Sequence, residues 1–233
     1  MSLSRIPAIP RFPVAQPVAV LLAAAALCVA ATAEAGIMRD LFAKIGGKST
    51  AAPAQTASGE LPTFPRPGFI CCSLRQDEDK ISDSSDAELQ IMKAGTPVTV
   101  LGYSGKNRAN LDVEGKKMVL DREYGREQEV LDTWVNKIVV AEDPRPRIAS
   151  WPFNIQAAVR AGQVVRGMTR QQALAALGYP RANVTKSIDD DVWRMFVGRG
   201  EYQLHFGADG KVATITGDGE VTSQVIYLAP PSK

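Results

Sequence analysis

The residue types that most often carry enzyme chemistry are scarce in this sequence. His205 is the single histidine among 233 residues, and it lies between Leu204 and Phe206. Nucleophilic catalysis needs a serine or cysteine, a base that activates it and a third group that orients the base. A serine–histidine–aspartate or cysteine–histidine arrangement would have to use His205, and no Gly-x-Ser-x-Gly elbow accompanies it. We therefore predict no catalytic residues and no cofactor.

Two further groups are candidates for redox or metal chemistry. Cys71 and Cys72 are adjacent, so they cannot join distant segments. Two reduced thiols alternating across a strand are favoured over a disulfide, and the spacing of cysteines and histidine predicts no metal site. Asp189–Asp191 is an acidic run, but calcium prefers acids that alternate with other residues before a glycine turn. We expect a solvated loop there.

Aromatic and arginine side chains gather between Asp143 and Arg170, where the sequence Ser150-Trp151-Pro152-Phe153 joins two predicted units. Aromatics flanked by arginines are enriched at protein interfaces. The alternative is that Trp151 fills the joint between the units, whereas Trp134 and Trp193 are expected in hydrophobic cores. The predicted protein-binding surface comprises Arg147, Trp151, Phe153, Arg160, Arg166 and Arg170.

The first 35 residues have the three zones of an export signal. Arg5 and Arg11 precede an apolar run over 18–33, and Ala33-Glu34-Ala35 offers a cleavage site. The run is shorter than the roughly 20 residues of a spanning helix, so cleavage after Ala35 is favoured over a permanent anchor. Lipidation at Cys28 is a second alternative. Residues 36–67, rich in alanine, proline, glycine and serine, are predicted to form a flexible linker.

Residues 68–147 are expected to form a β-rich, SH3-like unit that ends in a helix. Strands are predicted over 69–74 and 98–101, with a loop over 75–88 between them, and a hairpin is predicted to join 109–113 to 117–120. Apolar residues then recur at helical spacing between Glu127 and Val140. A proline-rich segment over 143–147 marks a domain boundary.

Residues 148–229 are expected to form an α+β unit in which two helices cover one face of an antiparallel sheet. A helix over 155–161 closes at Gly162. A second helix begins after Thr169, whose spacing from Gln172 is that of a capping box, and ends at Gly178. Strands are predicted over 192–197, 201–206, 212–216 and 221–228, with hairpin turns at 198–200, 207–210 and 217–219.

This second unit resembles the SmpA/OmlA family, which includes the BamE lipoprotein of the outer-membrane assembly machinery. The resemblance covers about residues 153–217. It rests on Gly167-Met168-Thr169-Arg170-Gln171-Gln172, Leu177-Gly178-Tyr179-Pro180, Trp193, Tyr202-Gln203-Leu204-His205-Phe206 and Gly210-Lys211-Val212. It implies a helix–helix–sheet fold, shared with β-lactamase inhibitor proteins, and protein binding rather than catalysis.

The leading functional hypothesis is a non-enzymatic cell-envelope protein that binds other proteins, in outer-membrane assembly or envelope integrity. Its partners would be envelope or outer-membrane proteins, and its location the periplasm or the outer membrane. The alternatives are a peptidoglycan-binding periplasmic module and a periplasmic enzyme or inhibitor. The formal net charge of +2 favours no nucleic-acid partner, because no basic stripe accompanies it.

Overall fold

The computed structural model describes residues 62–83 and 90–229. Every described residue belongs to one compact unit, residues 56–233. The predicted export signal, its cleavage after Ala35, the alternative lipidation of Cys28 and the linker up to residue 61 lie outside the described residues. Among the helices of the described residues, none has the length and apolar character needed to cross a membrane.

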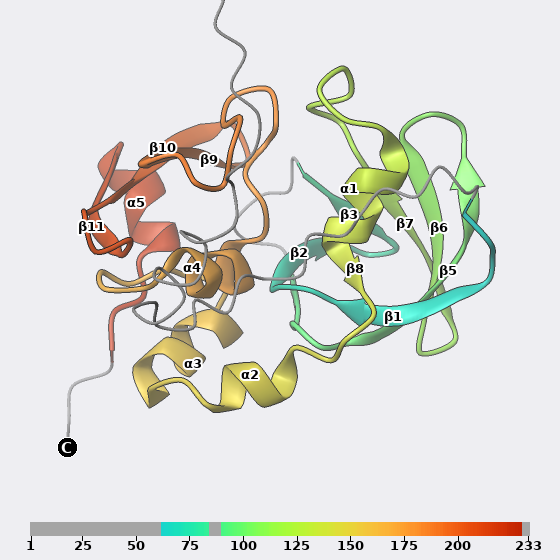
Figure 1. Cartoon of the computed structure of the whole chain (residues 1–233), viewed down its shortest axis with the longest axis horizontal. Coiled ribbons are helices and arrows are strands. Elements are labelled where there is room, and N and C mark those ends of the chain that lie inside the picture. Colours follow the sequence, from blue (N-terminus) through green and yellow to red (C-terminus); the bar gives the residue numbers. More distant parts are fainter. Residues whose placement is uncertain (1–61, 84–89, 230–233) are drawn as a thin grey trace, which may run out of the picture. The chain divides into compact units, whose positions relative to one another are not determined.

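An eight-stranded curled sheet occupies the first part of the described chain (Figure 1). Its strand order is β4-β2-β3-β7-β6-β5-β1-β8, and every neighbouring pair is antiparallel except β3 and β7, which are parallel. The strands are β1 Arg66–Ile70, β2 Leu74–Asp77, β3 Lys80–Ser82, β4 Gln90–Met92, β5 Pro97–Ser104, β6 Arg108–Val113, β7 Lys116–Asp121 and β8 Val139–Val140.

The hairpin between β6 and β7 is confirmed, and its turn follows from local chemistry. Glu114 and Gly115 both have positive φ angles, of 54° and 88°. Such a pair matches the right-handed twist of the two strands. The Asp112 side chain accepts a hydrogen bond of 2.8 Å from the Gly115 backbone N–H, which closes the turn.

The predicted helix before the boundary is confirmed, but it is shorter than expected. α1 spans Leu131–Ile138, and the apolar residues at spacings of three and four face the core. Val139 leaves the helix and pairs with Ile70, so β8 joins the curled sheet beside β1. Apolar periodicity alone predicted a helix through residue 140, because a buried strand that follows directly continues the same run of valines.

The strand predicted over 69–74 is wrong as a single strand. β1 ends at Ile70, β2 begins at Leu74, and a disulfide joins Cys71 to Cys72 where reduced thiols were favoured. Adjacent residues in a strand point to opposite faces, whereas bonded sulfur atoms require both side chains on one side. The chain therefore leaves the strand at the cysteines. The loop predicted over 75–88 is also wrong in part, because it contains β2 and β3.

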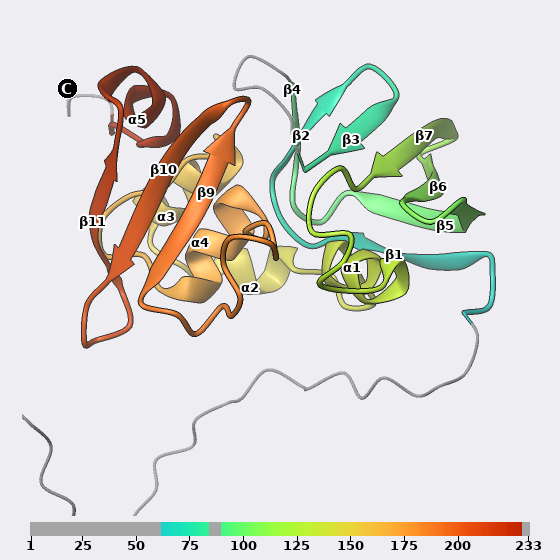
Figure 2. The same ribbon diagram turned by 90° about the horizontal axis from the view of Figure 1, so that it is seen from above.

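The second part of the described chain combines helices with a three-stranded sheet of order β11-β10-β9. Figure 2 shows α3 and α4 against one face of this sheet and α5 beside β10 and β11. Together with the curled sheet, this establishes an α+β protein. The elements are α2 Arg145–Ala149, α3 Phe153–Arg160, α4 Arg170–Leu177, β9 Val192–Val197, β10 Gly200–Phe206, β11 Val212–Gly217 and α5 Gly219–Val225.

The capping box predicted at the start of α4 is confirmed. The Thr169 hydroxyl accepts from the Gln172 backbone N–H at 3.3 Å, and the Gln172 side chain accepts from the Thr169 N–H at 2.9 Å. These two bonds satisfy backbone donors that a helix N-terminus otherwise leaves unpaired. Gly178 ends the helix with a φ of 79°, a conformation that favours glycine.

The strand predicted over 221–228 is wrong, as is the hairpin turn at 217–219. Residues 219–225 form α5, and the Asp218 side chain caps it by accepting from the Glu220 N–H at 2.9 Å. The segment 221–228 contains valine, isoleucine and tyrosine, residue types that are common in strands. The N-cap aspartate and the contacts of Val221 and Val225 with the C-terminal core decide for a helix instead.

Two separate hydrophobic cores lie inside these elements. The first joins the curled sheet to α1 and includes Ile70, Val100, Leu111, Leu120 and Trp134. The second lies between the three-stranded sheet and its helices and includes Val159, Met168, Trp193, Leu204 and Val212. Trp134 and Trp193 are confirmed as core residues, with 7% and 0% of their surface exposed.

Candidate functional site

A basic surface follows α2, α3 and the loop that leads to α4. The segment 144–170 contains five arginines and no acidic residue. Arg147 lies in the last turn of α2 and Arg160 in the last turn of α3, and both are exposed, as is Arg166 in the following loop. The backbone carbonyls at a helix C-terminus favour cations, which suits both helical positions. We call Arg147, Phe153, Arg160 and Arg166 the α2–α3 surface.

Phe153 is the apolar feature of this surface. It follows Pro152 at the first position of α3, and 77% of its area is exposed. Ile155 and Val159 point the other way, into the C-terminal core. Seven residues separate Phe153 from Arg160, so both lie on the same helix face, and the guanidinium carbon is 5.9 Å from the ring centre. The structure thus brings together two of the residues predicted from sequence.

Trp151 and Arg170, also predicted as surface residues, are used inside the fold. Trp151 is half-buried and packs against the C-terminal core, while its carbonyl accepts a 2.8 Å hydrogen bond from the Gln156 side chain. Arg170 lies 4.5 Å from the centre of the Phe206 ring. Its Nη2 atom contacts the carbonyls of Asp189 and Asp190 at 3.2 Å and the Asp191 carboxylate at 3.1 Å. Arg170 thereby anchors the acidic loop.

A second arginine site was not predicted from sequence. The Arg181 guanidinium packs against two aromatic rings, with its carbon 3.8 Å from the centre of the Tyr124 ring and 4.2 Å from that of Phe196, and we call this arrangement the Arg181 stack. Its Nε donates a 2.9 Å hydrogen bond to the carbonyl of Asp83. Asp83 follows β3, Tyr124 follows β7, Arg181 follows α4 and Phe196 lies in β9. No regular spacing in the sequence relates these four residues. Only an alignment of four separate elements in space creates the stack.

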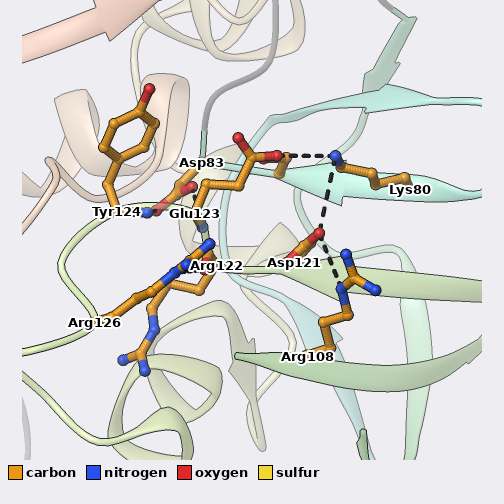
Figure 3. A network of polar contacts seen from close by, with 9 residues as sticks. Lys80, Asp83, Arg108, Asp121, Arg122, Glu123, Tyr124 and Arg126 are labelled. Carbon is orange, nitrogen blue, oxygen red and sulfur yellow. Dashed lines mark hydrogen bonds and ion pairs between the residues drawn. The ribbon is translucent and has the colours of Figure 1, made fainter. Parts of the chain in front are cut away.

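A polar network supports this stack from the side of the curled sheet (Figure 3). The Asp83 carboxylate accepts from the backbone N–H groups of Glu123 and Tyr124, at 2.8 and 3.0 Å. Lys80 binds the Glu123 carboxylate at 2.9 Å and lies 3.9 Å from Asp121. Burial raises the pKa of Asp83, and the hydrogen bond to Glu123 raises the pKa of Lys80. The network holds the chain on either side of Tyr124.

The Asp121 carboxylate extends the network to a third strand. It is almost fully buried and lies 3.1 Å from the Nε atom of Arg108 on β6. Arg122 is also buried, and it donates a 2.6 Å hydrogen bond to the Glu129 carbonyl. The Asp121 charge is matched by Lys80 and Arg108, and these contacts link three strands of the curled sheet. Across the described residues, no cluster of three histidine, cysteine or acidic side chains is arranged to hold a metal ion.

A cavity of about 100 Å³ lies beside the Arg181 stack. Arg181, Asp83 and Phe196 line it, together with apolar side chains that approach from both hydrophobic cores. All of its lining residues belong to the compact unit 56–233. Arg75 also lines it, and burial lowers the pKa of that guanidinium.

The residues considered for nucleophilic chemistry do not assemble into a catalytic site. His205 points away from the core, and its Nε2 atom is 2.8 Å from the Thr216 hydroxyl. Cys71 and Cys72 are bonded to each other, so neither offers a thiolate to a histidine. Comparison with known proteins finds no match to any family model, curated protein or solved structure. The functional proposals therefore rest on the side chains of this chain.

Proposed function

We propose that this is a non-enzymatic cell-envelope protein that acts by binding other proteins, in outer-membrane assembly or envelope integrity. The observation that carries the proposal is the α2–α3 surface, where an exposed phenylalanine lies among arginines in a segment without acidic residues. Phenylalanine and arginine are both enriched in protein interfaces. The charge of the surface favours a partner with an acidic patch, because complementary potentials speed association and reject wrong partners.

The proposed architecture pairs an SH3-like unit with an SmpA/OmlA-like unit. The meander β5-β6-β7, followed by α1 and by the return of β8 to β1, supports the first. Two helices followed by a three-stranded antiparallel meander support the second. The proposed location is the periplasm or the periplasmic side of the outer membrane, reached through cleavage after Ala35. This location rests on the residue pattern of the N-terminus.

Crosslinking in intact cell envelopes tests the proposal. Phe153→Ser and Arg160→Glu are each expected to abolish a crosslinked species that the unsubstituted protein forms. Matched controls are Val130→Ser, which removes another exposed apolar side chain, and Arg199→Glu, which reverses another exposed arginine. Both controls should retain the species. Each of the four changes should alter the free energy of unfolding by only about 0.5 kcal/mol, as is usual for surface substitutions.

Loss of the crosslinked species in all four variants, or in none, would refute a partner site on this surface. A partner without an acidic patch would refute the electrostatic part of the proposal. Cosedimentation with purified peptidoglycan sacculi, undiminished by Phe153→Ser and Arg160→Glu, would favour the peptidoglycan-binding alternative.

A further inference from the structure

The Arg181 guanidinium is oriented more rigidly than a surface arginine. Two aromatic rings pack against it, and its Nε atom donates to the Asp83 carbonyl, so contacts from separate elements hold it in place. Its Nη2 atom is buried and has no hydrogen-bond partner. A buried donor without an acceptor costs about 1–3 kcal/mol, and more for a charged group. An acceptor supplied by a ligand would remove that cost.

The neighbouring carboxylate does not supply this acceptor. Asp83 presents its backbone carbonyl to Arg181, while both of its carboxylate oxygens accept from the N–H groups of Glu123 and Tyr124. The Asp83 carboxylate is thus already satisfied. Arg181 therefore retains its positive charge beside the cavity without a carboxylate bonded to it.

The cavity beside Arg181 has walls that are part apolar and part polar, because Arg75, Asp83 and Tyr179 line it as well. Its volume of about 100 Å³ is several times the minimum of about 10–15 Å³ that a cavity needs to hold one water molecule, so a small organic group can enter it. The apolar part of the walls favours burial of an aliphatic side chain. It is formed by Leu74, Ile81, Leu177, Met195 and Val197.

We propose that this cavity is a binding site for a small carboxylate that carries an apolar side chain, as at the free C-terminus of a peptide. The planar guanidinium edge matches the two oxygens of a carboxylate, and one buried, unpaired N–H marks where an oxygen would bind. A phosphate matches less well, because it would bring a larger negative charge into a cavity that the acidic residue Asp83 also lines. The site is separate from the α2–α3 surface and does not depend on the function proposed for that surface.

Titration of the full chain with N-acetyl-leucine, followed by nuclear magnetic resonance, tests the site. The Arg181 Nε–H signal and the Phe196 backbone signal should shift and saturate. N-acetyl-leucinamide is the matched probe, since it keeps the side chain and removes the charge. The amide should bind at least about tenfold more weakly, a factor that corresponds to about 1.4 kcal/mol. Equal binding of the two probes, or saturation by neither, would overturn the proposal.

A variant pair locates the binding to Arg181. Arg181→Gln should lose the preference for the carboxylate, whereas Arg199→Gln, at an exposed arginine, should keep it. An unchanged preference in folded Arg181→Gln would overturn the assignment. If circular dichroism shows that Arg181→Gln does not fold, the comparison of acid with amide on the unsubstituted protein decides the question. A peptide that ends in leucine, with a free or an amidated C-terminus, then separates the two sources of the carboxylate. Tighter binding of the free peptide than of N-acetyl-leucine indicates a protein C-terminus. Equal binding of the two indicates a free small acid.

Discussion

The two halves of the described chain are stabilised by contacts of different range. In the part that contains α3, α4 and β9 to β11, caps and hairpin turns connect residues close in sequence. In the curled sheet, β1 pairs with β8 and β3 pairs in parallel with β7, across long stretches of chain. Local signals can be recognised in a sequence, whereas distant strand pairing depends on the whole fold. The helix-rich half was accordingly predicted more accurately.

The two arginine sites differ in the same way. Arg160 contacts Phe153 within one helix, in solvent, where a cation–π contact contributes about 0.5–1 kcal/mol. Arg181 is enclosed by residues from separate elements and has a buried, unpaired nitrogen atom. The exposed pair is available to a macromolecular partner, while the enclosed one suits a small ligand. Similar arginine–aromatic pairs therefore suit different kinds of ligand, depending on how far their surroundings bury them.

The largest expected effect tests whether the two halves unfold together. Trp193→Ala should lower the free energy of unfolding by about 3–5 kcal/mol, because the side chain is fully buried and packs 4.7 Å from the Phe206 ring centre. Urea unfolding followed by circular dichroism measures it. We expect one transition, as in the unsubstituted protein. Two transitions, of which only one shifts in Trp193→Ala, would mean that the halves are independently stable.

A smaller effect is expected at a hydrogen bond that joins the two halves. The buried Ser73 hydroxyl, before β2, donates to the Val159 carbonyl at 2.6 Å, and its N–H donates to the Ala175 carbonyl at 2.8 Å. Ser73→Ala should reduce the free energy of unfolding by about 1.5 kcal/mol, the loss of one buried hydrogen bond, because the Val159 carbonyl keeps the Gly162 N–H as a second donor. Ser104→Ala, at an exposed strand end, is the control. Equal thermal stability of the two variants would contradict a structural role for this bond.

The local contribution of the helix cap should be smaller again. Thr169→Ala removes the side chain that accepts from the Gln172 N–H, and it should cost about 1 kcal/mol in urea unfolding. Gln171→Ala changes an exposed neighbour outside the capping box and should alter stability by less than about 0.5 kcal/mol. A similar loss of stability in both variants would contradict a stabilising role for the Thr169 cap.

The last expected effect concerns the curled sheet and is a change of stability at alkaline pH. The Tyr103 hydroxyl donates to the Asp132 carboxylate, and burial, followed by this bond, raises the pKa of Tyr103 from 10.0 to about 12. A tyrosine whose pKa is raised in the folded state stabilises the fold below pH 10 and loses that contribution as the pH rises through 12. Unfolding of the unsubstituted protein should therefore become easier relative to Tyr103→Phe over this window. Parallel pH profiles for the two proteins would contradict the prediction.

Apolar periodicity and caps were sufficient for α3, α4, the β6–β7 hairpin and β9 to β11. They failed for the Cys71–Cys72 segment and for residues 219–225. A bond between neighbouring side chains overrides strand alternation, and an N-cap aspartate with core contacts overrides the β propensity of valine. The exposed pair of Phe153 and Arg160 was predictable because seven-residue spacing places both on one helix face. The Arg181 stack had no such spacing.

The sequence by itself determined the elements whose stabilising residues are neighbours along the chain. It also determined the basic character of segment 144–170, because charge is a property of composition. The tertiary structure alone decided that Trp151 and Arg170 are used inside the fold while Phe153 remains exposed. It alone placed two aromatic rings against Arg181 next to a cavity. The physical reason is that burial and stacking depend on which distant segments meet, and short-range patterns in a sequence do not encode those meetings.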